Sequence, residues 1–219
     1  MNIIKKHQNR KKLFAIAGIF IPLFTLTFSY KGPYGDLILV TFSQIGARYG
    51  AIEQLILWGI MTSIYYFSFL NYLFVMSGKN SIALKTLLSI TCMTLLITVF
   101  LPYAPTMFPI TSKTHNFLAY ITAASVVALL LLFILNLYTI EIKLFIKSLV
   151  VYLVSVSVIV FVLLYFGVSS LFQIILSAVM CILMFTLLLF LENCKDLNIY
   201  ENLEKYTTKD NSEVDIFWN

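Results

Sequence analysis

Few side chains in this sequence are suited to acid–base or nucleophilic chemistry, and His115 is the most suggestive of them. A histidine can act as a general base if a nucleophile lies within hydrogen-bond reach and another group orients the ring. The polar residues expected on the same side of the molecule are Ser43, Glu53 and Asp36. His115, Glu53 and Ser43 are therefore the candidate catalytic residues. The competing interpretation is that His115 only hydrogen-bonds to a neighbouring loop and holds it in place.

The sequence does not supply enough ligating side chains on one side of the molecule for a metal or haem site. The other histidine, His7, is expected on the opposite side, whereas a zinc site usually takes three or four ligands close together. Cys92, Cys181 and Cys194 lie in or beside apolar runs and form no CxxC pair, so we interpret them as packing residues. The sequence thus predicts no metal site and no cofactor.

The elements that must position these residues are transmembrane helices. Hydrophobic residues make up 60% of the 219 residues and charged residues 11%, whereas soluble domains are about 45–50% apolar and about 25% charged. A helix that crosses a bilayer needs about 20 apolar residues, while the strands of a membrane barrel alternate in hydrophobicity. We predict an all-α, polytopic transmembrane bundle of about six helices, at residues 13–30, 54–76, 84–104, 114–138, 144–166 and 169–191.

The distribution of charge predicts how this bundle is oriented. Five lysines and arginines lie in the N-terminal segment 1–12, and further lysines follow the second and fourth helices. Because such residues accumulate on the cytoplasmic side, we expect both termini there. The tail 192–219 has seven acidic residues and three lysines; it is expected to be solvated, with a short helix around 197–206 as the alternative. No basic domain exists that would bind nucleic acid.

Two loops on the predicted outer side, 31–53 and 105–113, concentrate the polar residues. The apolar stretch 37–42 in the first loop is expected to form a short strand or to lie in the membrane interface. Within the sixth helix, Gln173 most simply marks a helix–helix contact. We predict an outer pocket whose ligand-binding residues are Ser43, Gly46, Arg48, Glu53, His115 and Asn116.

The order of motifs in the two outer loops carries a family resemblance. Ser43-Gln44-Ile45-Gly46 is followed by Glu53 at the start of the second helix, then by a proline-bounded loop and His115. Over residues 30–138 this resembles the six-pass Frag/DRAM/Sfk membrane proteins and their bacterial relatives of unknown function, in which Ser-Asp-x-Gly often stands in the first loop. The resemblance implies a six-helix fold and outer-loop contacts at Ser43, Gly46, Glu53 and His115. Eukaryotic members are linked to lipid handling and autophagy regulation, whereas most bacterial members have no assigned activity, so the resemblance implies a fold more than a function.

Three functions remain open from the sequence. The leading hypothesis is a multi-pass membrane protein that binds lipid or regulates a partner through the outer pocket, because the catalytic set is incomplete. The alternatives are a lipid-directed membrane enzyme that uses His115 and a small-solute permease. We expect the protein in the cell (cytoplasmic) membrane. Membrane lipids are the expected partners, together with a membrane protein or a second copy of this chain.

Overall fold

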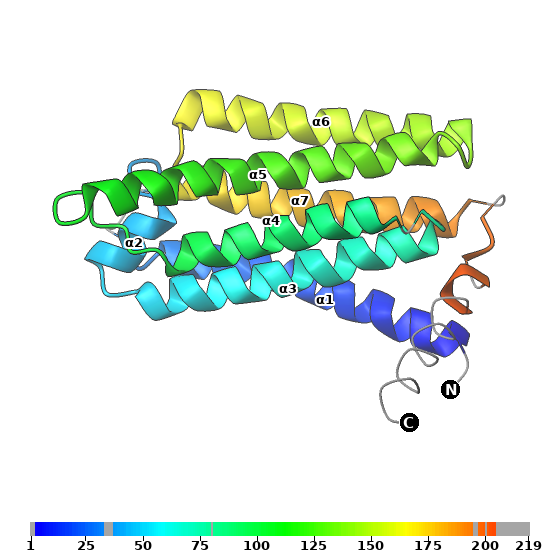
Figure 1. The fold of residues 1–219 in the computed structure, drawn as a ribbon, viewed down its shortest axis with the longest axis horizontal. Helices are drawn as coiled ribbons and strands as arrows, with labels where there is room; N and C mark the ends of the chain where they lie inside the picture. The colour runs from blue at the N-terminus through cyan, green and yellow to red at the C-terminus, as the bar shows by residue number, and fades with distance from the viewer. Residues whose placement is uncertain (1–2, 33–36, 80, 195–196, 200, 205–219) are drawn as a thin grey trace.

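A bundle of six long helices forms the protein (Figure 1), in a computed structural model that describes residues 3–32, 37–79, 81–194, 197–199 and 201–204. Each of the six is long and apolar enough to cross a membrane. This confirms the prediction of a helical, multi-pass membrane protein. The long helices are α1 (Ile3–Ser29), α3 (Ile52–Met76), α4 (Ile82–Phe100), α5 (Pro109–Leu137), α6 (Ile142–Phe166) and α7 (Ser170–Glu192).

The six helices pack in a closed ring. Going round it, α1 packs on α3, α3 on α4, α4 on α5, α5 on α6 and α6 on α7, and α7 returns to α1. Helix α3 also touches α7 across the ring, and its Phe69, Leu70 and Leu73 are fully buried. The outward faces carry exposed apolar side chains such as Ile16, and hydrocarbon is the solvent in which such a surface is stable.

One end of the bundle, here named the α2 end, is closed by a short helix that was not expected. The loop predicted at 31–53 contains α2 (Phe42–Arg48). Its start is a capping box, in which the Thr41 side chain accepts from the backbone of Gln44 and the Gln44 side chain accepts from the backbone of Thr41. The stretch 37–42 is therefore not a strand, because it turns and then enters this helix.

Proline chemistry moves the ends of two helices away from their predicted positions. Helix α4 ends at Phe100 and not at residue 104, because Leu101 precedes Pro102 and is extended, with ψ of 125°. Helix α5 starts at Pro109 and not at residue 114, because a proline is well tolerated in the first turn. His115 consequently lies in the second turn of α5 and not at its first residue.

The opposite end, here named the His7 end, involves both terminal regions that were predicted as separate segments. Helix α1 begins at Ile3, so it includes most of the basic segment 1–12. Helix α7 continues to Glu192. Residues 197–199 and 201–204, here named the return segment, pack on the bundle with Ile199 and Leu203 buried. This part of the tail therefore packs on the bundle by one face and is helical at 201–204, in line with the alternative of a short helix; Tyr206 and the rest of 205–219 lie outside the described residues.

Candidate functional site at the α2 end

Ser43 and His115 come together at the α2 end, from helices that are far apart in the sequence. The distance between Ser43 Oγ and His115 Nε2 is 2.6 Å, which is a short hydrogen bond. His115 is only 3% exposed, whereas Ser43 is partly exposed. A partly exposed serine thus lies against a buried imidazole, which is the arrangement of a nucleophile beside a general base.

The loop after α4 orients the His115 ring. Nδ1 of His115 lies 3.1 Å from the carbonyl oxygen of Leu101, and a carbonyl can only accept, so Nδ1 carries the proton. In the neutral ring Nε2 is then the acceptor, and the Ser43 hydroxyl donates to it. Tyr103 packs beside the ring, with 5.4 Å between the two ring centroids. The backbone N–H of Ala104 donates to Ser112 Oγ at 3.0 Å, which folds this loop back onto α5.

Ser43 is held in place by the residue before it. The Phe42 side chain is buried and meets the rings of Phe28 and Trp58 edge-on. The backbone N–H of Phe42 donates to the Gln173 side-chain oxygen of α7 at 2.9 Å. The start of α2 is therefore fixed on one side by aromatic packing and on the other by α7.

The chain that leads into α2 is also fastened to α7. The Val40 carbonyl accepts from the backbone N–H of Ser170 at 2.7 Å and from its hydroxyl at 2.8 Å. The Leu37 carbonyl accepts from the backbone N–H of Leu171 at 2.9 Å. These bonds satisfy N–H groups at the start of α7 that have no partner within the helix. Ser43 thus follows a stretch of chain that several hydrogen bonds fix to the start of α7.

Other predicted site residues do not join this pair. Gly46 is buried, and a Cβ there would lie 3.0 Å from Leu55 Cδ2, so its role is the close approach of α2 to α3. Arg48, Glu53 and Asn116 are exposed. None of these three has a hydrogen bond or ion pair with Ser43 or His115 in the described part of the chain. Asp36 lies outside the described residues.

Two groups of the site, the Gln173 side chain and the Leu101 carbonyl, were not predicted, and the sequence indicated them to different degrees. Gln173 was recognised as a polar residue in the last span, but nothing in the sequence indicates that it holds Phe42. The role of the Leu101 carbonyl could not be recognised from the sequence, because every residue has a backbone carbonyl.

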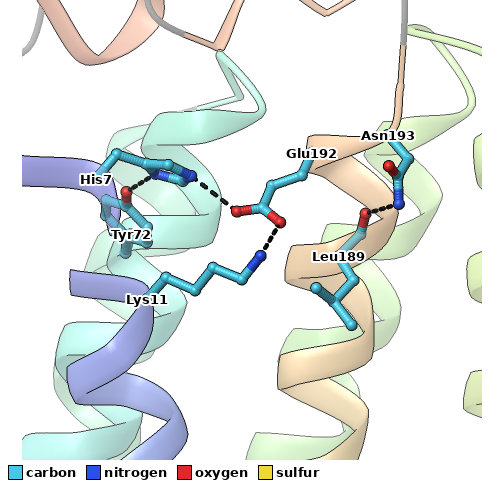
Figure 2. Close-up of polar contacts among 6 residues, drawn as sticks. All are labelled: His7, Lys11, Tyr72, Leu189, Glu192 and Asn193. Atoms are coloured by element: carbon cyan, nitrogen blue, oxygen red, sulfur yellow. Dashed lines mark hydrogen bonds and ion pairs between the residues drawn. The ribbon is translucent and has the colours of Figure 1, made fainter. Parts of the chain in front are cut away.

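A second polar cluster lies at the His7 end and was missed by the sequence analysis. Figure 2 shows His7 of α1 between Tyr72 of α3 and Glu192 of α7. His7 Nε2 lies 2.8 Å from one carboxylate oxygen of Glu192, and Lys11 Nζ lies 2.5 Å from the other. The Arg10 guanidinium stands 5.5 Å from the centre of the Tyr72 ring. The sequence signal for this cluster was Glu192, an acidic residue at the end of an apolar helix, which could pair with the basic N-terminal segment.

No family model, no curated protein and no solved structure matches this chain. The resemblance to the Frag/DRAM/Sfk proteins therefore stays a prediction.

Proposed function

We propose that the protein is a membrane enzyme that hydrolyses or transfers an acyl group of a lipid, with Ser43 as nucleophile and His115 as general base. The observation that carries this proposal is the 2.6 Å contact between Ser43 Oγ and His115 Nε2. The oriented partner that a histidine base requires is present in the Leu101 carbonyl. These two contacts support the enzyme hypothesis, which the sequence alone had offered as an alternative to a non-catalytic lipid binder.

The reaction follows from the protonation of the pair. Ser43 Oγ attacks the acyl carbonyl of an ester while its proton passes to His115 Nε2. The imidazolium then gives this proton to the departing alcohol oxygen as the ester C–O bond breaks. Water, or a second alcohol, then attacks the acyl-serine and gives its proton to His115 Nε2. The acyl–Oγ bond breaks, Ser43 Oγ takes this proton back, and a fatty acid or a new ester is released. The Leu101 carbonyl keeps Nδ1–H in place throughout, so that Nε2 always faces the hydroxyl.

The surroundings of the site support a lipid as the substrate. Large apolar side chains are exposed around the α2 end, among them Leu39, Met107, Phe108 and Ile110. Apolar residues at the end of a transmembrane bundle lie where hydrocarbon gives way to headgroups, and the ester groups of membrane lipids are found at that depth. The exposed cations Arg48 and Lys113 are suited to a lipid with an anionic headgroup.

The test is to incubate the purified protein in nanodiscs with acyl-ester lipids and, separately, with a fluorophosphonate probe that labels activated serines. We expect the wild type to release fatty acid or form a new ester, and to be labelled at Ser43. Ser43→Ala and His115→Gln should each lower turnover by about 10²–10⁴-fold, the usual contribution of a positioned base. Ser89→Ala and Glu53→Gln are the matched controls, because both side chains are exposed and neither touches the pair. A wild type that neither turns over any ester nor takes the label would contradict the proposal. So would full activity in folded Ser43→Ala protein.

Lipid binding without chemistry is the second candidate, and one observation favours it. Both ring nitrogens of His115 are engaged, so the ring also ties α2 to the loop after α4. A lipid that co-purifies equally with the wild type and with Ser43→Ala, together with no turnover and no labelling, is the result expected in this case. No described feature favours the permease in the same way.

A further inference from the structure

The return segment is attached to the His7 end by one face. Ile199 and Leu203 stand four residues apart, one above the other on the same face of a helical turn, and they are 8% and 6% exposed. Asn198, Glu201 and Glu204 point to solvent. The segment is thus amphipathic, with its apolar side in the same buried cluster as the ends of α3 and α7.

A polar contact fixes where the segment sits. The Asn202 side-chain amide donates to the Met76 carbonyl at 3.0 Å. This carbonyl belongs to the last turn of α3, where carbonyls have no partner within the helix. Gly78, with φ of 68°, lies beneath the same amide, and a Cβ at this position would come within 3.2 Å of Asn202 Nδ2. The end of α3 is therefore shaped to receive Asn202.

The segment forms one wall of a polar cleft. Ile199 lines the cleft together with His7, Gln8 and Glu192. Glu192 is the carboxylate that binds His7 and Lys11, so removal of the Ile199 wall would open an ionisable cluster to water. We propose that the return segment is a detachable latch, which covers the His7 end when docked and opens this cleft when released.

The physical basis is a balance between burial and chain entropy. Docking buries two apolar side chains and forms the amide bond, but it also orders a short piece of chain, each residue of which loses conformational freedom. Segments with few buried side chains open locally at much lower free energy than the core does. The docked and released forms therefore exchange without unfolding of the six helices.

The experiment uses the labelling rate of single cysteines with a membrane-impermeant maleimide, on full-length protein in nanodiscs, where both membrane faces are accessible. The reporter is Leu203→Cys at the buried face, and the reference is Asn198→Cys at the exposed face of the same segment. Both carry Cys194→Ser, since a serine hydroxyl can still donate to Glu141 as the thiol does. Cys92 and Cys181 remain as internal controls, because they are buried within the bundle and react only if it unfolds.

We expect Leu203→Cys to label to completion, but at least 10-fold more slowly than Asn198→Cys. Adding Ile199→Asp should raise its rate at least 10-fold, while the control Asn9→Asp places the same charge at an exposed position of α1 and should leave it unchanged. Equal rates for the two reporters would show that the segment does not dock. A reporter that Ile199→Asp does not accelerate, or that stays unlabelled in every variant, would show a fixed part of the bundle and overturn the latch.

Discussion

At the scale of single residues, hydrogen bonds between side chains on different helices set the geometry of both ends. His115 and His7 are each 3% exposed, and each uses both ring nitrogens to join elements that are distant in sequence. A third such bond lies near the α2 end, where the Trp58 indole N–H donates to Thr25 Oγ1 at 3.1 Å. Removing the acceptor there would leave the indole N–H of the partly buried Trp58 without this partner, which carries a desolvation cost.

Thr25→Val tests this cost, since valine keeps the shape of threonine and lacks the hydroxyl. We expect a loss of about 0.5–2 kcal/mol in the free energy of unfolding, the range for hydrogen bonds between transmembrane helices. Reversible unfolding in mixed detergent micelles measures it. Thr27→Val is the control, because Thr27 is exposed and bonds only to the Phe24 carbonyl of its own helix. Equal effects from the two substitutions would mean that the bond to Trp58 contributes nothing.

At the scale of elements, close contact between α3 and α4 depends on the absence of a side chain. A Cβ on Gly59 would lie 2.5 Å from Val99 Cγ2, nearer than two such carbons can come. Small residues of this kind let transmembrane helices approach one another and gain dispersion contacts. The approach of these two helices therefore relies on this pair of residues.

Gly59→Ala should destabilise the bundle by about 1–3 kcal/mol, the usual cost of overpacking a core. Val99→Ala removes the two methyl groups that the new Cβ would meet, so the double variant should be more stable than Gly59→Ala alone. Thermal unfolding of the four proteins in detergent gives the interaction energy of the pair. Purely additive effects would mean that the helices separate freely and that the contact is not a constraint.

The sequence predicted these elements unevenly, for physical reasons. The six spans follow from length and hydropathy, because a long apolar segment in a bilayer must satisfy its own backbone hydrogen bonds and therefore forms a helix. Helix α2 was not predicted, because it is too short for a periodic signal and its Thr41–Gln44 capping box is a local pattern that was not recognised in the sequence. Ser43, Glu53 and His115 were predicted on one side of the molecule, and the structure brings Ser43 and His115 into contact. Their contact could not be predicted, because it depends on Pro102 and Pro109 setting where α4 ends and α5 begins.

At the scale of the whole molecule, the ring places the basic start of α1 and the predicted outer loops at opposite ends. Asn9 is exposed at the His7 end and Asn116 at the α2 end. The excess of lysine and arginine predicts that the His7 end faces the cytoplasm, which puts the Ser43–His115 pair on the outer side.

Single cysteines at these two asparagines test the orientation with an impermeant maleimide on intact cells. We expect Asn116→Cys to be labelled and Asn9→Cys to be protected until the cells are lysed, because the reagent reaches only the outer face. Both variants also carry Cys194→Ser, and Cys92 and Cys181 are buried and should stay silent in both states. Labelling of Asn9→Cys before lysis would reverse the orientation and move the proposed chemistry to the cytoplasmic face.

The pairing of the first helix with the last has a consequence for biosynthesis. Helix α1 packs against α7, and Glu192, the partner of His7 and Lys11, is the final residue of α7. A nascent chain therefore inserts α1 while its main neighbour and its counter-ion are still untranslated. The ring can close only after α7 has been synthesised, so every earlier intermediate exposes the flank of α1 to the insertion machinery that accompanies it.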